Sequence, residues 1–233
     1  MNEWISDVQN DFYVAFIEKD RWVLYFQGLG VTLQIAFFAA ILGVIIGVTL
    51  ALMKLSVDKK GRKTFFAKVA DIYIDVIRGT PSVLQLLIMW FIVMANSKNG
   101  VLVAVLSFGI NSGAYVAEIV RAGIQAVDSG QMEAGRSLGL SKAKTMRYIV
   151  LPQALKNVLP PIGNEFIVLL KETAIVGYVS LTDLTRVANQ IVSRTYEAFM
   201  PLIGAAVIYF VVIKLFTILL NRLERRLRKS DYR

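Results

Sequence analysis

The chain has 233 residues, of which 56% are hydrophobic and 18% are charged, and its mean hydropathy is +0.57. This balance is too apolar for an ordinary soluble domain, because the apolar residues are concentrated in long runs. The sequence contains no Cys and no His, so thiolate and imidazole ligands are missing and we expect no metal site. The net charge of +9 does not indicate a nucleic-acid partner, because the basic residues alternate with apolar runs instead of forming one face.

The first apolar run, from Val23 to Met53, has 31 residues without a charge, more than the roughly 20 needed to cross a bilayer. Mixed-charge residues 1–22 precede it where a signal peptide would carry a short basic region, so we expect a retained span. Four further apolar runs lie near residues 66–95, 101–126, 158–180 and 201–221. The sequence therefore predicts an all-α membrane protein with five transmembrane helices within 23–220.

Basic residues predict the orientation, because cytoplasmic loops are enriched in Lys and Arg. The loops expected on one side carry 18 of these residues, and those on the other side carry 5. The richer side includes 54–68, 121–156 and 222–233. We therefore expect residues 1–22 to form an extracytoplasmic segment and residues 221–233 a basic cytoplasmic tail.

The cytoplasmic segment 128–157 joins spans three and four and has the pattern of two short helices. Asp128 is a typical N-cap, and Gly139 stands where a C′ residue takes a positive φ at low cost. Ser141 can cap a second, amphipathic helix that Pro152 stops or bends. Such a knob could lie on lipid as an interfacial hairpin or could dock a cytoplasmic partner.

The spacing of this segment resembles the EAA loop of membrane subunits of ABC importers. Gly135 stands where the usual pattern has Ala, a change between two small residues. In that family the loop fits a groove of the ATP-binding subunit. The matching positions are Glu133, Ala134, Gly135, Gly139, Ile149, Leu151 and Pro152.

The stretches "RGTPSVLQLL" from Arg78, "NEFIVLLKETAIV" from Asn164 and "RLERRLRK" from Arg222 are similar to the polar amino-acid branch of these permeases, the histidine, glutamine and arginine type. The resemblance implies an ABC type I importer permease fold in a bacterial inner membrane. It also implies two ATPase subunits that hold ATP and Mg, a second permease, identical or paralogous, and an extracytoplasmic binding protein that delivers a polar or basic amino acid.

Alternative functions are an ion-gradient-driven secondary transporter and a membrane anchor for a signalling complex. Secondary transporters commonly contain inverted repeats, and none is visible in this sequence. The sequence "GRKT" from Gly61 lacks the earlier glycine of a Walker A motif, so we expect no nucleotide hydrolysis by this chain and no cofactor of its own.

The fourth span is unusual because it carries Glu165, Lys171 and Glu172, and each buried charge costs roughly 2.5 to 3.5 kcal/mol on insertion scales. Glu165 follows Pro161 by one turn, which places it near the cytoplasmic end of a helix that begins there. We expect the carboxylate to face a water-filled path for the cargo, although neutralisation by other spans is an equal alternative for Lys171 and Glu172. The candidates for contact with the cargo are Glu165, Asn111, Gln85, Glu172 and Asn164.

Smaller patterns predict local structure. Thr80 and Pro81 read as N-cap and N1 residues, so the second span is expected to break near Gly79. Glu118 and Arg121 are expected to pair at i,i+3. Small residues that let helices approach closely are expected at Gly28, Gly30, Gly43 and Gly47.

Overall fold

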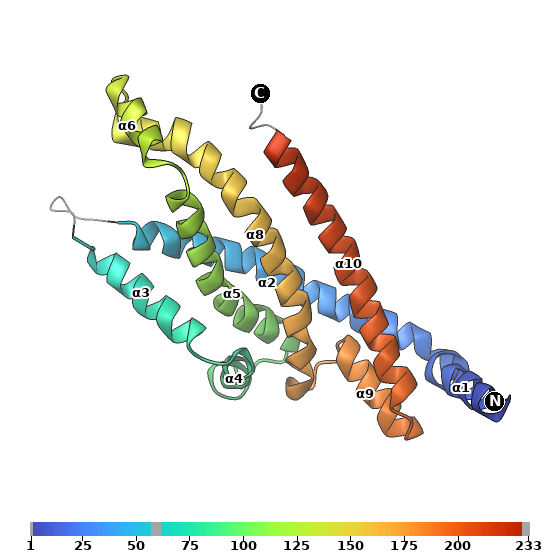
Figure 1. The fold of residues 1–233 in the computed structure, drawn as a ribbon. Helices are drawn as coiled ribbons and strands as arrows, with labels where there is room; N and C mark the ends of the chain where they lie inside the picture. Colours follow the sequence, from blue (N-terminus) through green and yellow to red (C-terminus); the bar gives the residue numbers. More distant parts are fainter. Residues whose placement is uncertain (1, 57–61, 230–233) are drawn as a thin grey trace.

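A computed structural model describes residues 2–56 and 62–229, and every regular element in these ranges is a helix (Figure 1). The all-α fold class is thus confirmed. The main helices are α1 (Asn2–Phe12), α2 (Arg21–Lys54), α3 (Phe65–Arg78), α4 (Ser82–Ile88), α5 (Gly100–Gln125), α6 (Ser129–Ser137), α7 (Lys142–Thr145), α8 (Leu151–Glu172), α9 (Leu184–Thr195) and α10 (Phe199–Lys229). Short π or 3₁₀ turns are η1 (Tyr13–Ile17), η2 (Glu18–Asp20), η3 (Met89–Val93), η4 (Met146–Val150) and η5 (Thr173–Val179).

Helix α2 crosses the molecule and packs along α5, and glycines set the distance between them. A Cβ atom at Gly43 would lie 2.9 Å from Cβ of Ser112, and one at Gly47 would lie 2.5 Å from Cβ of Val116. Both distances are too short for a real contact, so the close approach requires glycine. The expected packing role is wrong for Gly30, because a Cβ there would meet open space.

The second predicted span is broken as expected, since α3 and α4 meet at an angle of 103°. The details differ, because Pro81 occupies the N-cap position and the Thr80 hydroxyl donates back to the Val76 carbonyl at 3.0 Å. The break leaves the Ile77 carbonyl free, and Nε2 of Gln85 donates to it at 2.8 Å. A side chain thus replaces the backbone hydrogen bond that the bend removes.

Of the two alternatives predicted for Pro152, a stop is wrong, because α7, η4 and α8 follow one another without a break, and a bend stays a prediction. Pro152 lies in the first turn of α8, directly after the π turn η4, where a missing N–H is tolerated. The helix also runs through Pro160 and Pro161, so the fourth span does not start after them.

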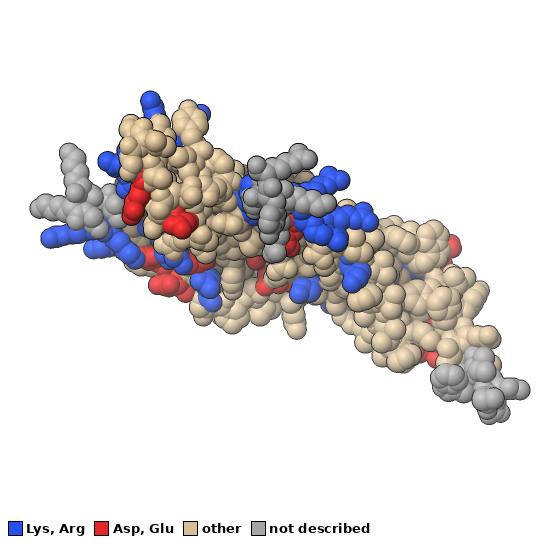
Figure 2. Space-filling model, turned by 45° about the horizontal axis from the view of Figure 1, so that its top comes forward, with Lys and Arg blue, Asp and Glu red and all other residues tan. Residues whose placement is uncertain are grey.

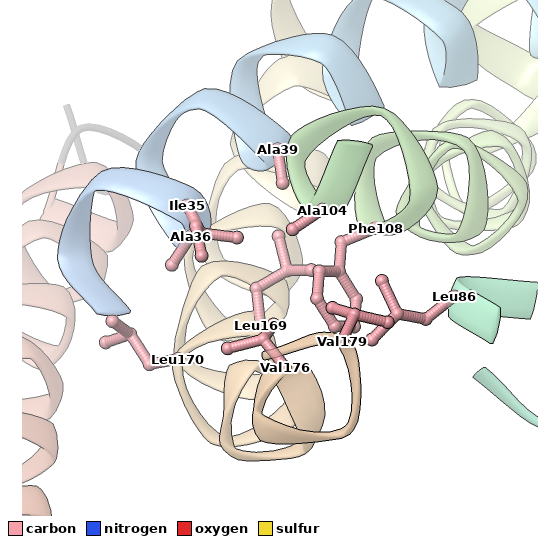
Figure 3. Close-up of a cluster of buried hydrophobic side chains, with 10 residues drawn as sticks. All are labelled: Ile35, Ala36, Ala39, Leu86, Ala104, Phe108, Leu169, Leu170, Val176 and Val179. Carbon is pink, nitrogen blue, oxygen red and sulfur yellow. The ribbon is translucent and has the colours of Figure 1, made fainter. Parts of the chain in front are cut away.

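A hydrophobic core joins the middle of the bundle and contains side chains from α2, α4, α5, α8 and η5 (Figure 3). Phe108 of α5 lies in it among Leu86 of α4 and Val176 and Val179 of η5. This cluster holds the broken α3–α4 segment against the end of α8. It therefore fixes α4, α5 and α8, the three helices that carry the polar candidates.

Ion pairs join α2, α3 and α5 near the 55–64 connection. Nζ of Lys54 lies 2.7 Å from Glu118 and 3.1 Å from Asp71. Glu118 also pairs with Arg121 at 2.8 Å, which confirms the expected pair, and Lys63 contacts Asp71. Asp71 is thus a member of an ion-pair network.

Three helical stretches are long and apolar enough to cross a membrane, namely Ser6–Lys54, Gly100–Gln125 and Phe199–Leu227, and the bent pair α3–α4 with η3 is a possible fourth. Helix α8 does not belong to this set, so five spans remain a prediction. Figure 2 shows blue Lys and Arg side chains gathered toward one end of the molecule, while the end that carries α1 is mostly tan.

Candidate coupling knob and translocation site

The predicted knob begins with α6, whose N-cap is Asp128. Its carboxylate accepts a hydrogen bond from the Gly130 N–H at 2.7 Å, which satisfies one of the free donors of the first turn. The expected N-cap is therefore confirmed.

Helix α6 ends in the turn that the sequence predicted at Gly139. This residue has a φ of +86°, and its N–H donates to the Arg136 carbonyl at 3.0 Å. The Leu140 N–H donates to the Gly135 carbonyl at 3.1 Å. These two bonds form a Schellman motif, in which glycine is favoured because the left-handed conformation carries no Cβ penalty.

The second helix packs tightly against the first. Ser141 caps it by accepting from the Lys144 N–H at 3.3 Å. A Cβ atom at Gly135 would lie 2.5 Å from Cγ2 of the buried Thr145 and 3.0 Å from Cδ1 of Ile149. Gly135 and Ile149 therefore hold the two helices together, and a change of Gly135 to Ala would require a shift.

The other motif residues lie on the surface of the knob. Glu133, Ala134, Leu151 and Pro152 are exposed. Leu138, which the motif does not include, is 81% exposed at the tip of α6. A large apolar side chain at a tip indicates a contact surface, and its position directly before the glycine of the turn was the available sequence signal.

A second set of polar residues lies inside the bundle. Nδ2 of Asn111 donates to Oε1 of Gln85 at 2.9 Å, and the Ser112 hydroxyl donates to Oε1 of Glu165 at 2.9 Å. Asn111 and Ser112 are buried neighbours on α5, so α5 connects Gln85 of α4 with Glu165 of α8. The structure thus brings three of the five candidates together around one helix.

The depth expected for Glu165 is wrong. Because α8 begins at Leu151, Glu165 lies about 21 Å along the helix at 1.5 Å per residue, well away from its N-terminal end. Glu172 is half-buried two turns further on, at the end of α8, whereas Asn164 and Lys171 are exposed. The two carboxylates, seven residues apart on α8, are thus less exposed than Asn164 and Lys171.

Sequence reasoning missed a buried carboxylate beyond α8. Asp183 has 0% exposure and accepts from the backbone N–H groups of Thr185 and Arg186, both at 3.0 Å, which caps α9. The Tyr209 hydroxyl of α10 donates to it at 3.3 Å. Burial raises the pKa of the Asp183 carboxyl above its usual range. An Asp three residues after "VS" and directly before a helical pattern was a weak N-cap signal.

Within the described residues, no group of three or more His, Cys, Asp and Glu side chains is arranged to hold a metal ion. Apolar helices, a polar cluster inside them and a rigid exposed knob at one end define the membrane-embedded subunit of a transport system. The particular family follows from comparison with known proteins.

The chain belongs to the family described as binding-protein-dependent transport system inner membrane component, which matches residues 41–229. It is 42% identical over 208 residues to the arginine transport system permease protein ArtQ of Bacillus subtilis (strain 168), covering 88% of this chain and 93% of that protein. It is 38% identical over 165 residues to the glutamine transport system permease protein GlnP of Escherichia coli (strain K12), covering 69% and 75% of the two chains.

The crystal structure of an amino acid ABC transporter with histidines is similar to this chain, with 49% identity and a TM-score of 0.80 over 87% of this chain and 94% of that one. An inward-facing methionine ABC transporter, MetNI, has 20% identity and a TM-score of 0.77 over 90% of this chain and 98% of that one, which shows the fold alone. The expected type I importer permease fold is thus confirmed, and the chain is a multi-pass inner-membrane protein of a transport system. The family is a transport permease and not a catalytic subunit.

Proposed function

We propose that this chain is the permease of an ATP-driven importer for polar or basic amino acids, and that a partner ATPase docks on the α6–α7 knob. Family membership carries the proposal, supported by the relatives named for arginine and glutamine transport. The chain then supplies the membrane path, while ATP and Mg bind to two partner ATPase subunits. An extracytoplasmic binding protein delivers the cargo.

The knob suits the coupling role because its shape is fixed before a partner binds. The Schellman turn at Gly139 and the contact of Gly135 with Thr145 leave little freedom between α6 and α7. A rigid element loses less conformational entropy on docking than a mobile loop, and it transmits displacement to the helices that follow. Because α8 continues directly from the knob, movement of the knob reaches Glu165 without an intervening hinge.

The docking proposal is tested with Leu138→Ala and Glu133→Lys. Loss of the exposed leucine should weaken ATPase association by roughly tenfold, or about 1.4 kcal/mol, as expected for an apolar anchor. Charge reversal at Glu133 should abolish association. Tyr178→Ala, an exposed residue of η5 outside the knob, is the control. Unchanged ATPase pull-down and transport in both knob variants would remove the coupling role.

The second permease is proposed to be an identical copy. Only 6% of the most apolar part of α10 is buried within the chain, so lipid or another protein must cover that helix in the membrane. Co-purification of two differently tagged copies of this chain tests the identical pair, and failure of the copies to co-purify would favour a pair of paralogues.

The whole proposal is tested by reconstitution in liposomes with the ATPase and the binding protein. Uptake of labelled arginine or glutamine should require ATP and should persist when ion gradients are collapsed. Uptake that needs a gradient and no ATP would support a secondary transporter instead. An assembled complex that moves no solute under either condition would favour an anchoring role.

A further inference from the structure

Arg78 is a charged side chain that neither the fold nor the coupling knob explains. It is the last residue of α3, it is exposed, and its Cζ lies 5.4 Å from the centroid of the Tyr115 ring on α5. This cation–π contact occupies one face of the guanidinium and leaves its in-plane N–H donors available. Within the described residues 62–229, Arg78 makes no ion pair. Asp75, one turn earlier on the same helix, does not pair with it either.

Helix α5 brings Arg78 close to the polar cluster. Tyr115 follows Ser112 by three positions, so the two residues are neighbours on the helix surface, one turn apart. Ser112 holds Glu165 from α8, and Tyr115 holds Arg78 from α3. A carboxylate and a guanidinium from two other helices thus approach α5 about 4.5 Å apart along its axis.

These opposite charges do not pair with each other, since the ion pairs among the described residues do not include Arg78 or Glu165. The half-buried charges of Lys54, Asp71 and Glu118 behave differently, because they make direct contacts of 2.7 to 3.1 Å. The half-buried Glu165 carboxylate and the exposed Arg78 guanidinium, neither in an ion pair among the described residues, suit a ligand that carries both charges and fits between them. An α-amino acid has that complementarity, because it carries an ammonium and a carboxylate on one carbon.

Resting on the proposed function, we propose that Arg78 binds the α-carboxylate of the transported amino acid while Glu165 meets its cationic group. The planar guanidinium presents paired donors that match a carboxylate, and stacking on Tyr115 fixes the plane in which they lie.

The bend between α3 and α4 determines where this guanidinium can point. Nε2 of Gln85 bonds to the Ile77 carbonyl at 2.8 Å and to the Thr80 hydroxyl at 2.7 Å, on both sides of Arg78. Gln85 also accepts from Asn111 of α5 at 2.9 Å. Gln85 and Asn111 are therefore positioning residues for Arg78.

The test compares binding of L-arginine and of agmatine, which is arginine without the carboxylate, to the assembled permease–ATPase complex. The wild type should bind agmatine at least about tenfold more weakly, because it lacks a charged hydrogen-bonding group. Arg78→Gln should weaken arginine binding by at least about tenfold and leave agmatine binding unchanged, so the discrimination disappears. Arg186→Gln, an exposed position on α9, is the matched control and should keep the preference for arginine over agmatine.

The inference would be overturned if Arg78→Gln still preferred arginine over agmatine as strongly as the wild type, or if the wild type bound both ligands equally. In either case, ATP-dependent uptake of amino acids would leave the proposed function intact. Binding of neither ligand by the wild type would overturn it together with the proposed substrate class. If Arg78→Gln does not assemble, Arg78→Lys decides, because it retains the charge but not the paired donors. Reduced discrimination in that variant supports the proposal, and undiminished discrimination overturns it.

Discussion

Glu165 combines a charge with a central position, since its carboxylate accepts from Ser112 inside the bundle. Glu165→Gln keeps the size and the acceptor oxygen but removes the charge. We expect arginine affinity to fall by roughly tenfold and glutamine affinity to change little, because only arginine adds a side-chain cation. Equilibrium binding of both amino acids to the assembled complex measures this, with Asp7→Asn, an exposed position on α1, as the control. Equal arginine affinity in wild type and variant would make Glu165 structural.

Asp183 contributes to the stability of the fold and not to transport, because its carboxylate caps α9 and accepts a hydrogen bond from Tyr209 of α10. Asp183→Ala should lower the free energy of unfolding by about 1 to 2 kcal/mol through loss of the cap. Asp183→Asn keeps an acceptor for the α9 N–H groups and should be tolerated. Thermal unfolding in detergent compares the two variants, and equal losses would contradict the capping role.

Asp183 should also make the stability of the protein depend on pH. Burial raises the folded-state pKa of Asp183 above its ordinary 3.8, so the folded state binds more protons than the unfolded state between those two values. Stability contributed by this group is present below the ordinary value and is lost as pH rises through the raised one. The melting temperature of Asp183→Asn should lack this part of the pH dependence. An identical pH profile in variant and wild type would rule it out.

At the scale of elements, the α6–α7 turn depends on one backbone conformation. Gly139 has a φ of +86° and open space around a would-be Cβ, so substitution there tests conformation without a steric clash. Gly139→Val should abolish ATPase association while the protein still inserts, because a β-branched residue resists positive φ. Gly139→Asn should retain most association, because Asn tolerates the left-handed region. Similar behaviour of both variants in pull-down would argue against the turn as the cause.

The geometry of the α3–α4 break depends on contacts with neighbouring helices. Pro81 predicted the position of the break, because proline cannot continue the backbone hydrogen bonding of α3. The angle of 103° depends on Gln85, which bonds across the break, and on Leu86, which is buried in the core beside Phe108. These contacts join distant parts of the chain, so spacing along the sequence could not reveal the angle.

For the whole molecule, the distribution of Lys and Arg predicts which side each loop occupies. Reporters fused after Lys63 and after Arg228 should report the cytoplasm, and one fused after Asn99 should report the outside. A fusion after Arg136, within the knob, provides a further cytoplasmic reference. A cytoplasmic signal at Asn99 would reject the proposed five-span topology.

The sequence by itself determined the membrane class, the caps at Asp128 and Ser141, the positive φ of Gly139 and the broken second span, because each depends on local composition or on residues a few positions apart. Only the tertiary structure decided that Pro152 lies inside a continuous helix, that Asp71 and Lys54 pair, and that Ser112 binds Glu165. The same holds for Arg78 over Tyr115. These contacts form when helices pack, and the free energy of a buried charge depends on the partner that packing brings to it.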